Sequence, residues 1–397
     1  MSARRSTAIT ILLACLLGAA MGAPAWAAKG DLVGPRQPAA APPPGFAFDA
    51  PMHGSRSGLA FGAEAELRFH YDRVFGVADP NWLTMVRASG FASARLSSRV
   101  SLLGAAGYDR ATKQLELERA SVDVRLGRAS HGQVGVLLLP ISTSNLALHA
   151  PHEEFTDRTL VATELIGTPV AQLGIGLRRE VARPGGTRAL EFDLVTGYDG
   201  GLLTDAPDGT RLPAGRNTFG GKGSSYAAVS RSAWTWKGGS ALGVAALGGM
   251  YTPVDPVGKP YGGGHPLGLV VVDGARVMKG FRLTGEAAYV HVDVPGDLEA
   301  LFAQDQWGAS VTVGRTLFAP LWKSWENSAL SVAVRAESVD FDGGLRGDSK
   351  RRVSTTIDLR QRPFAVIRWG WYYEVRVDRL DNPTPAAGLT LSAATFF

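Results

Sequence analysis

The sequence predicts an all-β fold, a transmembrane antiparallel β-barrel with sixteen strands. Three observations predict it. From about residue 58 onward, polar and apolar residues alternate in segments of about ten to fifteen residues that end at turn residues. The connections between these segments are alternately short and long. Beyond the N-terminus, no apolar stretch approaches the roughly 18 residues that a membrane-spanning helix requires.

The predicted strands are recognised by where each alternating segment begins. We count sixteen, and totals from about fourteen to eighteen also fit the pattern. The segments begin near Leu59, Leu83, Arg99, Leu115, Gln133, Ala171, Arg188, Ser225, Ala241, Pro266, Phe281, Gln304, Ser328, Arg351, Phe364 and Gly388.

The lengths of the connections support a barrel. Tight turns follow mostly the even-numbered strands: Ser97-Ser98, Gly238-Gly239, Lys279-Gly280 and Arg362-Pro363. Longer polar loops follow the odd-numbered strands: 70–82, 142–170, 200–224, 253–265, 295–303, 342–350 and 379–387. Short turns at one end, long loops at the other and an even number of strands are typical of outer-membrane barrels.

The two faces of the strands agree with this interpretation. In the segment after Phe364, Ile367, Trp369 and Trp371 share one face, while Arg368 and Arg376 share the other. A sheet in a membrane must close on itself, because unpaired edges are not tolerated in hydrocarbon. At this size a closed barrel encloses a water-filled channel, in which inward charges are solvated. A soluble all-β protein would also alternate and remains the alternative.

The N-terminus predicts secretion. Residues 1–27 have the positive start, apolar stretch and Ala25-Trp26-Ala27 cleavage site of a signal peptide. Cys15 leaves a lipoprotein signal as an alternative, and after cleavage no cysteine remains. Residues 28–57 form a proline- and alanine-rich periplasmic segment, and residues 58–397 form the barrel. Without Arg4 and Arg5 the formal charge falls from +5 to +3, which gives no reason to expect a nucleic-acid partner.

The longest loop, residues 143–170, contains the residues that could bind a metal ion or take part in catalysis. A metal site at His149-x-x-His152-Glu153 has suitable ligand types but no framework that fixes their geometry. Ser144, His149 and Asp157 could form a catalytic triad only if the fold brought them together. The remaining alternatives are a solvated surface loop and a loop that lines a channel.

Two stretches resemble known outer-membrane proteins. The final segment, GLTLSAATFF, resembles the C-terminal strand of Gram-negative outer-membrane proteins, in which the terminal Phe, here Phe397, is read by the barrel assembly machinery. The region around the long loop resembles a motif of the phosphate-selective-porin-like family. The matching residues are Gly135, Leu137, Leu138, Pro140, Asn145, His149, Pro151, Asp157, Arg158, Val161, Glu164, Gly174 and Gly176. The sequence departs from the motif at His152, and the tryptophan expected near residues 169–172 is absent.

The resemblance implies that the third external loop folds into the lumen and forms the constriction. The constriction residues would be Asn145, His149, His152, Glu153, Glu154, Asp157, Arg158 and Glu164. The inward positions of the strands would supply a lumen wall of Arg87, Arg95, Arg119, Arg125, Arg360, Arg368, Glu374 and Arg376. An acidic loop that faces a basic wall creates a transverse field, and we expect weak ion selectivity of either sign. Four loop carboxylates against Arg158 alone argue against phosphate selectivity.

The sequence therefore predicts a porin of the Gram-negative outer membrane that passes small hydrophilic solutes by diffusion. We expect no cofactor, no metal and no catalysis. The alternatives are a substrate-specific channel for an anion or sugar and, third, an outer-membrane enzyme. The expected partners are outer-membrane lipid, lipopolysaccharide and the assembly machinery, and the resemblance alone implies a homotrimer.

Overall fold

The computed structural model describes most of the predicted barrel. The described residues are 53–54, 58–78, 83–109, 114–147, 153–204, 209–219, 224–253, 262–296, 298–321, 327–361 and 365–396. They belong to a unit that runs from Pro43 to Phe397. The predicted signal peptide (1–27), all but two residues of the segment 28–57, and His149, His152 and Phe397 lie outside the described residues.

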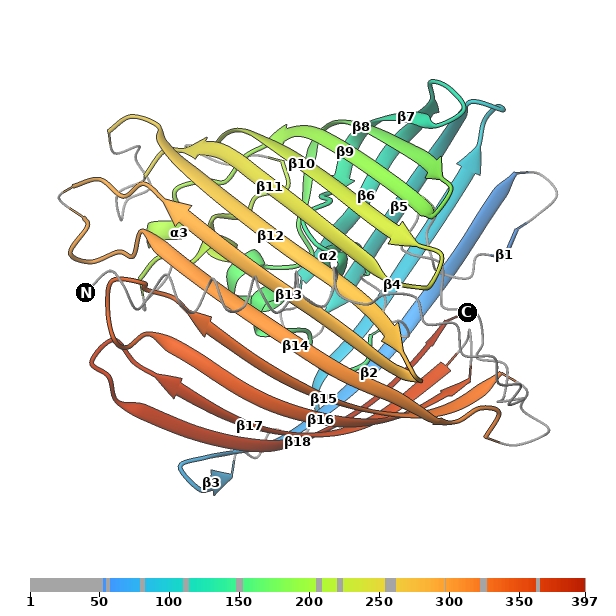
Figure 1. Cartoon of the computed structure of the whole chain (residues 1–397). Coiled ribbons are helices and arrows are strands. Elements are labelled where there is room, and N and C mark those ends of the chain that lie inside the picture. The colour runs from blue at the N-terminus through green and yellow to red at the C-terminus, as the bar shows by residue number, and fades with distance from the viewer. Residues whose placement is uncertain are drawn as a thin grey trace. The chain divides into compact units, whose positions relative to one another are not determined.

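Sixteen long strands form a closed antiparallel barrel (Figure 1). They are β2 (Leu59–Val74), β4 (Leu83–Arg95), β5 (Val100–Asp109), β6 (Gln114–Arg125), β7 (Ser130–Leu138), β8 (Ala171–Arg183), β9 (Gly186–Thr196), β10 (Ser224–Trp236), β11 (Ala241–Tyr251), β12 (His265–Met278), β13 (Phe281–Val292), β14 (Asp305–Phe318), β15 (Ser328–Asp340), β16 (Ser349–Gln361), β17 (Ala365–Val377) and β18 (Pro383–Phe396). Each pairs with the next along the chain, and β18 closes the ring on β2, with Ala393 opposite Leu67. The short strands β1 (His53–Gly54) and β3 (Val77–Ala78) also pair with β2. Among the described residues, no helix is long and apolar enough to cross a membrane.

The predicted barrel and its sixteen segments are confirmed. The largest displacement is in β18, which was expected to begin at Gly388 and begins at Pro383. Proline seldom occurs inside a sheet because it lacks a backbone donor, but it is tolerated at the start of a strand. Here Pro383 pairs with Val377, and Pro385 pairs with Val375. Because of these prolines, the first residues of the strand did not look like a strand in the sequence.

The predicted tight turn at Lys279-Gly280 is also present. Both residues have positive φ, +49° and +82°, as a two-residue type I′ hairpin requires. At the opposite end, Phe75-Gly76 repeats this geometry and joins β2 to β3 inside the predicted loop 70–82. We refer to the two rims as the short-turn end and the long-loop end.

The outer surface of the barrel is apolar and the inner surface polar, as the alternation predicted. Trp369 on β17 is 59% exposed on the outside, whereas its neighbour Arg368 is completely buried inside. On β2, Leu67 and Phe69 point outward while Glu66 faces the interior. An apolar exterior around a polar interior is the reverse of a water-soluble sheet and is typical of a barrel in lipid.

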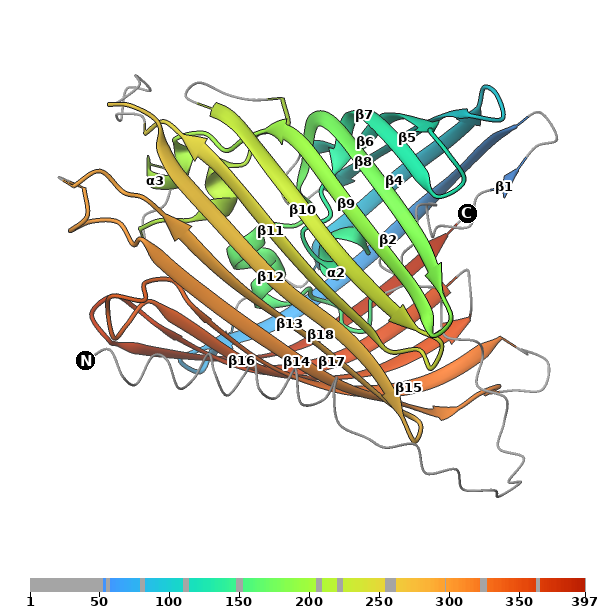
Figure 2. The same ribbon diagram turned by 45° about the horizontal axis from the view of Figure 1, so that its top comes forward.

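The lumen differs from the expected water-filled channel, because an apolar core fills part of it. Four short helical segments lie inside the ring of strands: α2 (Thr143–Leu146), the π-helical turn η2 (Val161–Ile166), α3 (Gly201–Thr204) and the 3₁₀ turn η3 (Leu212–Gly215) (Figure 2). Side chains of η2, such as Leu165, pack with Leu202 and Leu212 against inward-facing strand residues such as Val271 and Val290. Several central strands are apolar on both faces, so their inner face must be covered as well. The loop between β9 and β10 therefore enters the lumen together with the predicted loop.

Candidate functional site: the passage beside the lumen loop

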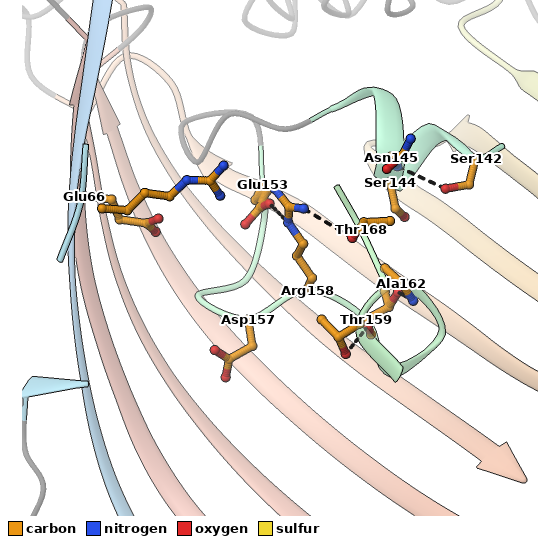
Figure 3. A network of polar contacts seen from close by, with 12 residues as sticks. Glu66, Ser142, Ser144, Asn145, Glu153, Asp157, Arg158, Thr159, Ala162 and Thr168 are labelled. Carbon is orange, nitrogen blue, oxygen red and sulfur yellow. Dashed lines mark hydrogen bonds and ion pairs between the residues drawn. The ribbon is translucent and has the colours of Figure 1, made fainter. Parts of the chain in front are cut away.

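The loop between β7 and β8 crosses the lumen and is fixed where it leaves the wall. Ser142 caps α2 by accepting a hydrogen bond from the backbone N–H of Asn145 (3.0 Å). The completely buried side chain of Asn145 donates to the carbonyl oxygens of Leu139 (2.7 Å) and Val170 (3.2 Å). It also accepts from the N–H of Val170 (2.7 Å). Asn145, one of the predicted constriction residues, thus ties the two ends of the loop together. Figure 3 shows it beside its capping partner Ser142.

Arginines of the opposite wall hold the far part of the loop by its backbone. Arg368 on β17 donates to the carbonyl of Glu153 (2.9 Å), and Arg360 on β16 donates to the same oxygen. Arg335 on β15 donates to the carbonyl of Asp157 (2.9 Å). This segment has no regular secondary structure, so its carbonyl groups need side-chain donors. The predicted wall residues Arg360 and Arg368 therefore act as anchors of the loop.

The acidic side chains of the loop pair with cations or a histidine. Glu153 accepts from Arg158 (2.8 Å), Glu154 pairs with Arg282, and Glu164 accepts from Lys350 (3.0 Å).

Asp157 lies 3.4 Å from Nε2 of His70 on β2. Burial alone would raise the pKa of Asp157, but His70, Arg352 and Arg68 lie close enough to hold that pKa below its usual value. Asp157 is therefore ionised at neutral pH.

The predicted wall residues do not form one basic surface. Arg87 pairs with Glu118, and Glu374 lies 3.4 Å from Lys350. Arg119 is buried in the wall, with Ser121 accepting its Nε–H. Arg95, Arg125 and Arg376 take inward positions at the ends of their strands, where they are exposed at the rims.

Several functional residues were missed by the sequence analysis. They are Glu66, Arg68, His70, Glu118, Arg335, Glu337, Lys350, Arg352 and Tyr372. The charged alternation Glu64, Glu66, Arg68, His70, Asp72 along β2 could have revealed some of them, because all five share the inward face.

A cavity of about 440 Å³ remains between the loop and the wall opposite the apolar core. Most of the residues that line it are charged or bear a hydroxyl group. It comprises Arg68, His70, Arg87, Gly107, Glu116, Asp157, Arg158, Leu160, Thr163, Glu164, Thr168, Pro169, Lys350, Arg352, Tyr372 and Glu374. We call this cavity the passage.

Ser144 and Asp157, two of the three residues of the possible triad, have partners on different strands. Ser144 donates to Glu286 on β13 (2.9 Å), whereas Asp157 faces His70 on β2. Figure 3 shows Ser144 and Asp157 at separate places on the loop. His149 and His152, on which the triad and the metal site depend, lie outside the described residues. Within the part that is described, no three His, Cys, Asp or Glu side chains are grouped as metal ligands.

Comparison with known proteins identifies the fold. No family model and no curated protein matches the chain. An anion-selective porin from Comamonas acidovorans superposes with a TM-score of 0.56 at 10% identity, covering 85% of this chain and 99% of that one. OmpF of Salmonella typhi, in a complex with daunomycin, gives 0.55 at 10% identity over 86% and 99%. The trimer form of OmpT, an outer membrane protein of Vibrio cholerae, gives 0.51 at 10% identity over 86% and 100%. This chain therefore has the fold of outer-membrane porins, while the resemblance to the phosphate-selective-porin-like family is not confirmed.

Proposed function

We propose that this protein is a channel of the Gram-negative outer membrane through which small hydrophilic solutes and ions diffuse passively. The observation that carries the proposal is a closed barrel, apolar outside, that retains a polar cavity of about 440 Å³ beside a lumen loop. Such a barrel can span lipid without unpaired backbone groups. Water and hydrated solutes can enter the polar cavity, whereas the apolar core excludes them.

The passage favours small polar solutes over apolar ones. Its wall pairs cations with carboxylates, for example Arg87 with Glu118 and Arg352 with Glu337 (2.6 Å). A solute that enters must replace water at these groups, which an apolar molecule cannot do. Diffusion through the passage requires no cofactor and no covalent step.

The proposed surroundings follow from the same function. The apolar exterior would contact outer-membrane lipid and lipopolysaccharide, and Phe397 would be read by the assembly machinery. A homotrimer is supported by the trimeric form of one structural relative, at 10% identity.

Conductance of the purified protein in planar lipid bilayers tests the proposal. We expect stepwise, voltage-independent current increments. Thr163→Trp, which adds bulk at an exposed side chain of the passage, should lower the size of each increment. Leu345→Trp, at an exposed position in the loop between β15 and β16, should leave it unchanged.

Three results would change the proposal. Folded protein that inserts but gives no current would exclude a channel. Saturable block of the current by one solute would favour a substrate-specific channel for an anion or sugar. A hydrolytic activity that His149→Ala abolishes while conductance stays intact would instead support the alternative of an outer-membrane enzyme.

A further inference from the structure

The arginines of the passage are more deeply buried than its lysine, Lys350, which is 19% exposed. Four guanidinium groups line the passage, and their side chains are only 9–14% exposed. Each is bound to a carboxylate: Arg68 to Glu66, Arg87 to Glu118, Arg158 to Glu153 and Arg352 to Glu337. The carboxylates therefore largely neutralise these arginines, which contribute little to the electrostatic potential in the water of the passage.

The arginines that anchor the loop are also buried beside carboxylates, and Arg335 and Arg368 share Glu337 and Glu66 with Arg352 and Arg68. Arg335 lies 3.2 Å from Glu337, and Arg360 lies 2.7 Å from Asp358. The guanidinium of Arg368 is completely buried and lies 3.9 Å from Glu66. These groups strengthen the loop's attachment without presenting a positive surface to a passing ion.

Carboxylates, in contrast, project into the water of the passage. Glu164 is 35% exposed, Glu116 30% and Asp157 26%. Their partners are shared or lie at the edge of contact distance. Lys350 is shared between Glu164 and Glu374, Arg216 approaches Glu116 only to 3.4 Å, and Asp157 lies 3.4 Å from His70, with Arg352 and Arg68 also nearby.

Unpaired acceptors behind the passage add to this imbalance. Within the described residues, Oε2 of Glu118 and Oε2 of Glu153 are buried and receive no hydrogen bond. Both belong to carboxylates that pair with arginine, and Oε2 of Glu153 also lies 3.7 Å from the guanidinium of Arg68. The most exposed charges of the passage are thus the carboxylates Glu116, Asp157 and Glu164.

We propose that the passage selects cations, meaning alkali-metal ions and small amine-bearing solutes, with Glu116, Asp157 and Glu164 as the selectivity-determining residues. The proposal rests on the proposed channel function. Carboxylates in a narrow passage with low-dielectric walls concentrate cations and exclude anions. The formal net charge of the whole chain, +5, has the opposite sign, because it also counts charges outside the passage.

Reversal potentials in a potassium chloride gradient across a planar bilayer test this proposal. We expect wild-type protein to pass K⁺ in preference to Cl⁻ at about 0.1 M salt, and less so at about 1 M, where the Debye length shrinks from about 10 Å to about 3 Å. The double variant Glu116→Gln/Glu164→Gln should lower the K⁺/Cl⁻ permeability ratio by about twofold or more. Lys350→Gln should raise the ratio, because it removes the cation shared by Glu164 and Glu374.

Glu299→Gln serves as the matched control. Glu299 is exposed in the loop between β13 and β14 and does not line the passage, so the ratio should stay at the wild-type value. A wild-type channel that prefers Cl⁻ would overturn the proposal while leaving the channel function intact. So would a cation preference that the double variant leaves unchanged, or a fall in the ratio on Lys350→Gln. Absence of any current would instead contradict the channel itself.

Discussion

At the scale of single residues, Asn145 has the most demanding position in the loop. Its side chain uses both amide donors and its carbonyl oxygen, and all three bonds join backbone groups that lie 6 or 25 residues away. The partner groups belong to Leu139 and Val170, which are themselves completely buried. No shorter or purely accepting side chain can make all three bonds.

Asn145→Ala should therefore loosen the loop. The substitution leaves the buried backbone N–H of Val170 without its partner, at a cost of about 1–3 kcal/mol, and it removes one of the two hydrogen bonds that each of the carbonyls of Leu139 and Val170 accepts. We expect a lower thermal unfolding temperature and noisier single-channel currents. Leu345→Ala, at the exposed position between β15 and β16, is the control and should change neither quantity. Currents as quiet as those of the wild type would show that the loop does not depend on this residue.

The arginines of the wall show what residue type alone predicts. Alternation placed Arg360 and Arg368 on the inward face of their strands, and this is where they lie. Their partner, the carbonyl of Glu153, is 207 and 215 residues away in the sequence. A pattern with period 2 reports the face of a side chain but carries no information about a partner at that distance.

At the scale of elements, the lumen loop is held by contacts between side chains and backbone on several strands. It reaches Asp273 on β12 through Thr143, Glu337 on β15 through the N–H of Leu160, and Ser392 on β18 through Thr156. Contacts distributed around the ring leave the loop little freedom to swing. The loop is thus part of the wall of the passage in its resting arrangement.

A disulfide can test whether the loop moves during conduction. Thr156 and Ser392 are buried, and their hydroxyl oxygens lie 3.3 Å apart, so the double variant Thr156→Cys/Ser392→Cys should oxidise to a disulfide. The sequence contains a single other cysteine, Cys15, in the predicted signal peptide. We expect the same single-channel conductance before and after reduction, because the cross-link fixes an arrangement that already exists.

The single variant Thr156→Cys, treated in the same way, controls for the substitution itself. A conductance that changes on oxidation and recovers on reduction would mean that the loop leaves β18 in the conducting channel.

At the scale of the whole molecule, one sheet is exposed to two different solvents, lipid around the barrel and water at its rims. Ile357 on β16 and Leu345 in the rim loop that precedes β16 are exposed to similar extents, 44% and 42%. The first faces the band of the barrel that lipid would surround, and the second lies at the long-loop end. The same exposed fraction therefore has a different energetic meaning at the two positions.

Ile357→Arg should destabilise the barrel, whereas Leu345→Arg should not. Arginine on the lipid face costs about 2–4 kcal/mol near the middle of the membrane and about 0–1 kcal/mol near the interface. Denaturant titration of the folding equilibrium in lipid vesicles measures the difference. Equal stability of the two variants would contradict the membrane orientation of the strands.

The sequence by itself determined the strands, their two faces, the closure of the barrel and the presence of a long loop after β7. These features depend on local patterns: alternation with period 2, turn residues and the lengths of connections. Only the tertiary structure decided how the lumen is filled. The apolar core joins η2 and η3 to strands β10–β13, and the cavity joins the loop to β2, β6 and β16. Which charges are compensated and which face water depends on partners far apart in the chain, because electrostatic compensation is a property of distance in space.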